Sequence, residues 1–200
     1  PLRWPLAEVP GALERHARWI ARTLARQRRR SLAASRLRVA DGERLGLLGE
    51  ELTLRFLPDP SADARSRVWR DGSEILVSHP PLAEPSPCAP LRAWLRAVAA
   101  REIPARVDAA AAAIGLHPER VSVRDQRTKW GACSASRGVS LNWRLVLAPT
   151  AVLDYVVVHE LCHLRELNHS PRFWALVGRH RPGFEAQRAW LRDNGAALDI

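Results

Sequence analysis

The sequence is poor in cysteine and lacks long apolar runs. These absences argue against a disulfide-stabilised protein and against a membrane-spanning one. Cys88, Cys133 and Cys162 are the three cysteines of the 200-residue chain. An odd number at irregular spacing argues against a disulfide framework and fits a reducing compartment. No segment approaches the roughly 20 consecutive apolar residues of a membrane-spanning helix, and the N-terminal residues have no signal-peptide pattern. We therefore expect a soluble, cytoplasmic protein with no membrane partner.

Lysine is nearly absent as well, because Lys129 is the only one and arginine carries the net charge of +10. The charge is uneven: between Gly11 and Arg38 a single acid, Glu14, stands among many arginines. Such a run can attract phosphate backbones or acidic substrates. It also suits the solvated face of a packed helix, which is the simpler interpretation, and the sequence leaves both open. The candidate nucleic-acid contacts are Arg22, Arg26, Arg28, Arg29 and Arg30.

The N-terminal part of the chain is predicted to form a basic helix followed by a small β-sheet. Residues 8–33 have apolar side chains at helical spacing with arginines over the rest. Alternating residues predict two short strands within 37–56, and residues 68–77 predict a hairpin with an Asp-Gly turn. The proline-rich segment 79–90 is typical of a linker. We therefore predict an N-terminal lobe of basic helix and small sheet over residues 1–85 and a second domain over residues 86–200.

The second domain is predicted to combine helices and strands in a mixed α+β fold. A helix is expected over residues 91–114, interrupted or kinked at Pro104 and ended by Gly115. Two strands joined by a loop, at 121–130 and 139–147, are predicted to form a hairpin whose exposed edge suits an extended peptide. Three further helices are expected at residues 150–167, 170–179 and 184–194.

The segment HELCHLRELNH, residues 159–169, carries the residues with the clearest chemistry. On a helix, His159 and His163 lie one turn apart on the same face, about 6 Å along the axis, so both imidazoles can bind one metal ion. Glu160 lies roughly 100° round the helix from His159. Its carboxylate can face a metal-activated water without ligating the metal, as the general base of metal-assisted hydrolysis must.

A catalytic zinc site usually has three protein ligands and one open position, so a third ligand is required. We favour His169, provided that the helix ends after Leu167, because Asn168 tolerates the left-handed conformation that ends helices. Glu185, in a later helical segment, is the alternative third ligand. The HExxHxxxxxH spacing is shared with metzincins, but the chain contains no methionine, which excludes a Met-turn enzyme of that group.

Two more side chains are candidates for a role beside the metal. Tyr155, the only tyrosine, precedes His159 by one helical turn on the same face. It could orient that histidine or donate a hydrogen bond to an oxyanion, although packing is the simpler interpretation. His180 is the second oxyanion candidate, with an ordinary surface position as its alternative.

Three separated segments resemble the YgjP-like metallopeptidase family, which is akin to SprT-like proteases. In chain order they are TKWGACSASRGVSLNWRLVLAP (128–149), VLDYVVVHELCHL (152–164) and NHSPRFWALV (168–177). The resemblance implies a zincin-like catalytic domain with its active-site helix under a small antiparallel or mixed sheet. It also implies one zinc ion per chain, bound by His159, His163 and His169, with Glu160 as catalytic acid and base. Ala132 stands where the family has serine, a small departure that leaves the metal site undisturbed.

The sequence therefore predicts a zinc metallopeptidase that hydrolyses peptide bonds of peptides or unfolded proteins, with Glu160 as general base. One alternative is a DNA-associated protease that acts on DNA-bound or crosslinked proteins and uses the basic N-terminal helix as its tether. Another is a nucleic-acid-binding protein with a structural zinc site. Glu160 argues against the last, because a structural site prefers four protein ligands and has no use for a base beside two histidines.

Overall fold

The computed structural model describes residues 9–33, 39–59, 66–80 and 88–200, with side chains of the first helix described up to residue 22. The chain forms two compact units, Pro1–Ser35 and Arg36–Ile200. The domain boundary predicted at residues 85/86 lies within 81–87, outside the described residues. Among the described helices, none has both the length and the apolar character that crossing a bilayer requires.

The first unit contains the helix α1 (Val9–Ala33), as predicted for residues 8–33. Among its described side chains Ala12 is buried, whereas Leu13 and Trp19 are 54% and 67% exposed. Arg22 is exposed too. The side chains of Arg26, Arg28, Arg29 and Arg30 lie outside the described ones, so their predicted contact with nucleic acid stays a prediction.

The second unit begins with a four-stranded sheet in the order β1-β2-β4-β3. Its strands are β1 (Arg44–Leu47), β2 (Glu50–Pro58), β3 (Val68–Asp71) and β4 (Glu74–His79). The predicted strands of this region and the Asp71-Gly72 hairpin turn are confirmed. Leu48 and Gly49 both have positive φ, 51° and 87°, which gives the tight turn that antiparallel β1 and β2 need. Strands β2 and β4 pair in parallel.

Helix α2 (Cys88–Ile114) follows the sheet and supplies one long apolar face to the core. The buried positions recur every four residues along this helix, as burial of one face requires. It runs unbroken past Pro104, so the predicted interruption there is not observed. Gly115 ends the helix with a φ of +70°, as predicted. The buried face consists of Leu91, Leu95, Ala99, Ile103, Val107 and Ala111.

A second, three-stranded sheet has the order β5-β7-β6. Its strands are β5 (Arg120–Arg124), β6 (Gly131–Cys133) and β7 (Gly138–Asn142). The predicted hairpin between the strands at 121–130 and 139–147 is wrong, because β5 and β7 pair in parallel. The antiparallel partner of β7 is β6, which lies inside the segment predicted as a loop.

The predicted strand at 139–147 is also too long, because Trp143–Leu147 form the 3-10 helix η2. The Asn142 side chain starts this turn by accepting a hydrogen bond of 3.1 Å from the Arg144 backbone N–H. Trp143, Leu145 and the residues that follow are buried. A short apolar run suits a buried helical turn as well as a buried strand, so periodicity alone could not distinguish them.

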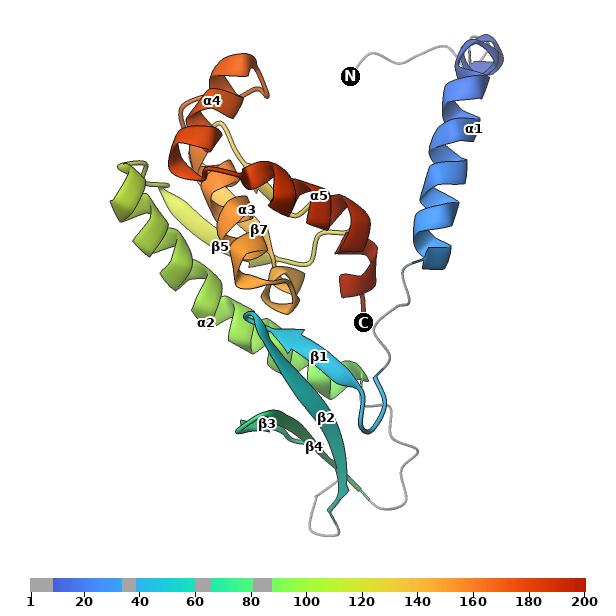
Figure 1. Cartoon of the computed structure of the whole chain (residues 1–200), viewed down its shortest axis with the longest axis vertical. Coiled ribbons are helices and arrows are strands. Elements are labelled where there is room, and N and C mark those ends of the chain that lie inside the picture. The colour runs from blue at the N-terminus through green and yellow to red at the C-terminus, as the bar shows by residue number, and fades with distance from the viewer. Residues whose placement is uncertain (1–8, 34–38, 60–65, 81–87) are drawn as a thin grey trace. The chain divides into compact units, whose positions relative to one another are not determined.

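Three helices complete the unit: α3 (Thr150–Cys162), α4 (Pro171–His180) and α5 (Phe184–Asn194), followed by the 3-10 turn η3 (Gly195–Leu198). The boundaries predicted for the last helix are confirmed. Ser170 caps α4 by accepting a hydrogen bond from the Phe173 N–H at 3.4 Å. In Figure 1, α3 lies alongside α2 with β5 and β7 beside it.

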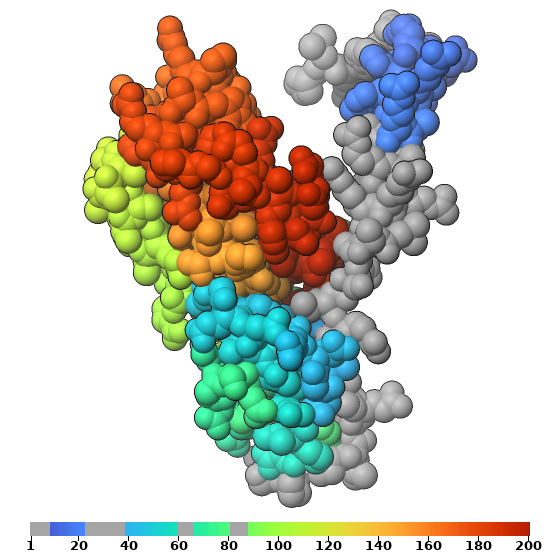
Figure 2. Space-filling model, in the orientation of Figure 1, coloured from blue at the N-terminus to red at the C-terminus, as the bar shows by residue number. Residues whose placement is uncertain are grey.

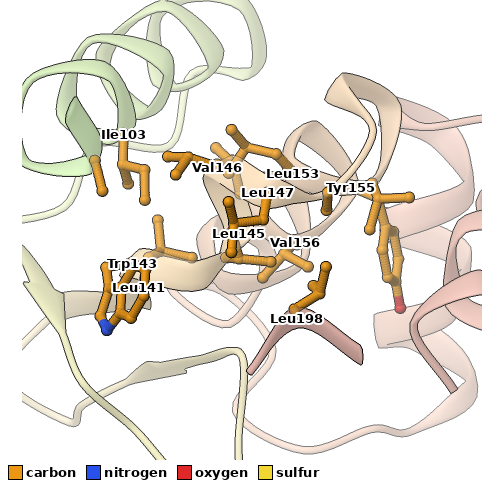
Figure 3. Close-up of a cluster of buried hydrophobic side chains, with 14 of the residues drawn as sticks. Ile103, Leu141, Trp143, Leu145, Val146, Leu147, Leu153, Tyr155, Val156 and Leu198 are labelled. Carbon is orange, nitrogen blue, oxygen red and sulfur yellow. The ribbon is translucent and has the colours of Figure 1, made fainter. Parts of the chain in front are cut away.

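The core of this unit is built from elements far apart in the sequence. Figure 3 shows Ile103 from α2, Leu141 from β7, Trp143 from η2, Val156 from α3 and Leu198 from η3 gathered in one cluster. The β1–β2 turn joins the same body, because the Thr150 hydroxyl donates to the Leu48 carbonyl at 2.7 Å. Figure 2 accordingly shows the four-stranded sheet, in cyan and green, next to the orange and red helices. The α+β class is confirmed.

Candidate metal centre

The metal-binding segment depends on where α3 ends. The helix stops at Cys162, with His163 as its cap, rather than after Leu167 as predicted. The Glu166 N–H donates to the Cys162 carbonyl at 3.0 Å, which closes a final turn and reverses the chain. The earlier ending is needed to bring His169 back, because a longer helix would carry it away along the axis. The predicted left-handed conformation of Asn168 is not observed, because the non-glycine residues with positive φ in the described chain are Leu48 and Arg137. Asn168 instead accepts a hydrogen bond from the Ser170 N–H at 3.2 Å, just before α4.

The structure brings His159, His163 and His169 together, each offering one ring nitrogen within 4.8 Å of the others. The two Nε2 atoms of His159 and His169 lie 3.1 Å apart, too close for both to carry a hydrogen. The Nδ1 of His163 lies 2.9 Å from the Glu166 carbonyl, so donation there leaves Nε2 as the lone-pair atom. Three converging imidazole lone pairs with one side open fit a catalytic zinc site.

Glu185, the alternative third ligand, is not part of this group. Among the described residues, the set that could hold a metal ion consists of the three histidines. Glu185 lies in the first turn of α5, and its charge contributes to raising the pKa of Tyr155. The geometry therefore favours His169 as the third ligand.

The electrostatics favour the neutral form of His159 and His169, which is the form that binds a metal. Burial lowers the pKa of His159 to about 3, and the charges of His163 and His169 add to the shift. Burial likewise lowers the pKa of His169, with His163 again contributing. A neutral imidazole need release no proton when a cation binds, so these two histidines are prepared for one.

Glu160 is buried next to the three histidines, and one of its carboxylate oxygens has no hydrogen-bond partner among the described residues. Its side chain is 5% exposed, and within the described part of the chain Oε2 has no hydrogen-bond partner. Burial raises its pKa to about 7, against a smaller lowering by Lys129. Strand β6 packs flat against this carboxylate: a Cβ on Gly131 would lie only 2.5 Å from Oε1. A carboxyl group held in this way can take up or release a proton near neutral pH.

Aromatic rings hold the histidines in place. Phe173, fully buried, stacks on His163 with ring centroids 4.3 Å apart and meets His159 edge-on at 4.9 Å. Trp174 stacks on His169 at 5.4 Å. This packing fixes ring orientation before any ion binds.

The two oxyanion candidates lie in different surroundings. The Tyr155 hydroxyl lies 3.5 Å from the Nδ1 of His159, and its ring stacks on Phe184 with centroids 5.9 Å apart. This is the position from which a hydroxyl orients a ligand imidazole. His180 lies at the far end of α4, about 10 Å along the helix axis from Phe173, and none of the described contacts joins it to the triad. Both catalytic roles stay predictions.

Sequence reasoning missed three residues near the site. Gly131 contacts Glu160, and Lys129 lowers the Glu160 pKa. The guanidinium of Arg188 lies 4.4 Å from the centre of the Trp174 ring and lowers the pKa of both His159 and His169. For Gly131 the sequence offered one signal: it is a glycine next to a predicted strand. Glycine often occurs at such positions because another group approaches the backbone closely. Nothing in the sequence distinguished Arg188 from the other arginines.

The chain is similar to one protein family and to two solved structures. The family model of the YgjP-like metallopeptidase domain matches residues 1–194. No curated protein matches the chain. Two solved structures are similar: the metallopeptidase zymogen abylysin of Pyrococcus abyssi, at 22% identity, and the zymogen jannalysin of Methanocaldococcus jannaschii, at 18%. Each match covers 46% of this chain, and 97% and 93% of the respective relative, with a TM-score of 0.40 in both cases.

Proposed function

We propose, from the premise that the chain belongs to the YgjP-like metallopeptidase family, that it is a zinc-dependent endopeptidase in which Glu160 is the general base. The observation that carries this proposal is the buried carboxylate of Glu160, unpartnered at Oε2 in the described chain, beside three converging imidazoles. A structural zinc site has no need of such a group, because it is closed by four protein ligands. The uncompensated carboxylate instead suits proton transfer.

The donor set favours zinc as the metal. Three neutral imidazoles and an open fourth position are the ligands of many catalytic zinc sites, whereas calcium and magnesium prefer oxygen ligands. Zinc held by His159, His163 and His169 would act as a Lewis acid that polarises the substrate carbonyl and lowers the pKa of water. One ion per chain follows from the single histidine group among the described residues.

Glu160 would carry the proton through the reaction. Its Oε2 is free to accept the proton of the attacking water, and its pKa of about 7 suits both uptake and later release to the leaving amine. Gly131 keeps strand β6 against the carboxylate without a side chain in between. Strand β6 lies at the edge of its sheet, so an extended peptide can pair with it close to Glu160.

The DNA-associated alternative depends on the arginines of α1. Arg15, Arg18 and Arg22 are exposed among its described side chains, as phosphate contacts require. The chemistry at the metal would be unchanged, and α1 would act as a tether for substrates on DNA. This alternative adds a partner to the peptidase and does not compete with its mechanism.

Replacing Glu160 by glutamine tests the proposed mechanism. Glu160→Gln keeps the shape of the side chain but removes proton acceptance, so zinc content should stay near one ion per chain while cleavage of an unfolded protein falls by at least about 10²-fold. Metal analysis and peptide cleavage assays on the same preparation measure both. Glu166→Gln, in the same segment, is the matched control and should keep its activity. Near-normal turnover by Glu160→Gln would end the general-base assignment.

A further inference from the structure

The three-stranded sheet has two faces with different chemistry. Side chains alternate between the faces of a strand, and the pairing aligns Val121 with Val139 and Val123 with Leu141. These apolar residues share the face of Gly131, which contacts Glu160 of α3. The opposite face consists of Arg120, Ser122, Arg124, Gly138, Ser140 and Ala132.

This outer face is hollow and positively charged. Its residues line a cavity of about 730 Å³, to which Lys129 and Asp125 also contribute. Asp125 is the only acid in the lining, and it is already engaged by Arg96 and, at 2.5 Å, by Arg144. The hydrogen bond from Arg144 holds its pKa below the usual value, so it stays ionised and paired. Arg120, Arg124 and Lys129 therefore leave the hollow with a net positive charge.

Small polar groups form the floor of the hollow and leave room over the middle strand. Ser122, Ser140 and Ala132 lie in one row across the three strands. The Arg124 Nε donates to the Ser122 hydroxyl at 3.4 Å, which places the guanidinium at the β5 end of this row. In the middle of the row the Gln126 Nε2 donates to the Ser140 hydroxyl at 3.2 Å, so an incoming carboxylate would meet this amide as well as the arginines.

The hollow and the catalytic carboxylate lie on opposite faces of the same edge strand. Within β6, Gly131 faces Glu160 and Ala132 faces the hollow. Lys129, at the entrance to β6, lines the hollow and also lowers the Glu160 pKa. A peptide paired with the free edge of β6 would continue the sheet, and its alternate side chains would reach the two faces in turn.

We infer that this hollow binds an acidic side chain of the peptide substrate, at the position that pairs with Ala132, and so makes the enzyme selective for acidic segments. The inference rests on the peptidase function proposed above. A nucleic-acid ligand is less suited to the hollow, because its lining has no aromatic side chain on which bases could stack. The unpaired edge of β6 also offers backbone hydrogen bonds, which an extended peptide uses.

A set of matched peptides tests the inference. Peptides that differ only in carrying Glu, Gln or Lys at successive positions around the cleaved bond are compared by kcat/KM. Glu should exceed Gln by about tenfold at one position, as a hydrogen-bonded charge pair allows, and the ratio should fall as salt is added. At the neighbouring positions, whose side chains face the other side of the sheet, the ratio should be close to one.

Changes in the hollow should move this ratio. The double change Arg120→Glu and Arg124→Glu should reverse the preference towards Lys, and the milder Arg120→Gln with Arg124→Gln should remove it without reversal. If charge reversal prevents folding, the glutamine variant still tests whether the two arginines cause the preference. Arg179→Glu, an exposed position on α4 outside the lining, is the control and should leave the ratio of the unmodified enzyme unchanged.

The possible results separate the inference from the proposed function. Cleavage of all the peptides with no preference for Glu would overturn the inference and leave the peptidase function standing. Failure to cleave any of them would overturn both. If the double glutamate variant keeps the peptide ratio but loses binding to a fluorescent single-stranded oligonucleotide, the hollow is a phosphate-binding surface and the acidic-peptide inference is wrong.

Discussion

At the residue scale, the centre combines ligands that are kept neutral with a carboxyl group that is kept near its titration point. Burial shifts the two pKa values in opposite directions. It lowers the pKa of His159 to about 3 and raises the pKa of Glu160 to about 7. Burial disfavours the charged form of each group. The same low-dielectric site thus leaves His159 neutral and lets Glu160 take up a proton near pH 7.

The identity of the third ligand can be decided by two substitutions. His169→Ala removes one of the three converging ring nitrogens, so the protein should purify with little zinc, since loss of one ligand weakens binding strongly. Glu185→Ala should keep its metal. Zinc per chain, measured on both variants after equal dialysis, checks this, and the reverse result would make Glu185 the ligand.

The isolated carboxyl group should leave a pH signature in the metal-free protein. The folded pKa of Glu160 is about 7 against a reference value of 4.5, so its contribution to stability is complete below about pH 4.5 and is lost as the pH rises to about 7. Metal-free Glu160→Gln should therefore unfold with a free energy up to about 3 kcal/mol higher than the unmodified protein at pH 8. At pH 4 the two should differ little.

Urea unfolding at the two pH values measures this difference. Glu119→Gln is the control, because the Glu119 side chain is 73% exposed and its replacement should change stability little at either pH. A Glu160→Gln effect of the same size at pH 4 and pH 8 would contradict burial as the cause.

At the scale of elements, the three-residue strand β6 matters more than its length suggests. Its first residue contacts Glu160, its middle residue faces the charged hollow, and its outer edge is unpaired in the sheet. Helix α3 carries His159 and Glu160, with His163 as its cap, but β6 determines what lies next to Glu160. The helix–strand contact is therefore the part of the site most sensitive to a small change in shape.

Gly131→Ala tests that contact. The added Cβ would lie 2.5 Å from Oε1 and 2.7 Å from Cδ of Glu160, so the carboxylate must move. A displacement of about 1 Å can lower turnover by about 10²-fold, while zinc content should stay normal because the ligands are untouched. Gly178→Ala, whose Cβ would meet Phe184 at an ordinary 3.7 Å, is the control. Unchanged kcat in Gly131→Ala would show that β6 does not position the base.

At the scale of the whole molecule, the basic helix and the catalytic body form separate compact units. A tether and a catalytic centre in separate units can be altered independently. The net charge of +10 favours association with polyanions in general. A specific contribution of α1 to DNA binding is therefore tested by changing its arginines.

Salt dependence distinguishes phosphate contacts from a solvated helix face. If α1 binds DNA, each lost contact should reduce the log–log slope of binding against salt by about 0.7 for single strands and about 0.9 for duplexes. Reversing Arg26, Arg29 and Arg30 to glutamate should abolish binding and any stimulation by DNA, while peptide cleavage at the metal centre continues. Absence of DNA binding by the unmodified protein at about 50 mM salt would leave α1 as a solvated helix.

Local sequence patterns were enough to predict the parts of the molecule that depend on local geometry. Helical spacing places His159 and His163 on one face with Glu160 beside them, and capping and breaking residues predicted α4 and α5 within one residue of their bounds. The Asp71-Gly72 turn was equally local. In each case, residues within a few positions of one another decide the outcome.

The remaining features could not be predicted locally, because they depend on contacts between segments distant in the sequence. The early end of α3 brings His169 back to the triad, where Phe173 and Trp174 hold the rings. Strand β6 forms from a segment with no strand pattern because β7 offers it an edge, and β7 pairs with β5 in parallel. The 3-10 turn after Asn142 replaces a strand because burial stabilises either conformation of an apolar run. The burial that sets the pKa of Glu160 likewise requires Gly131, from another element, to lie against it.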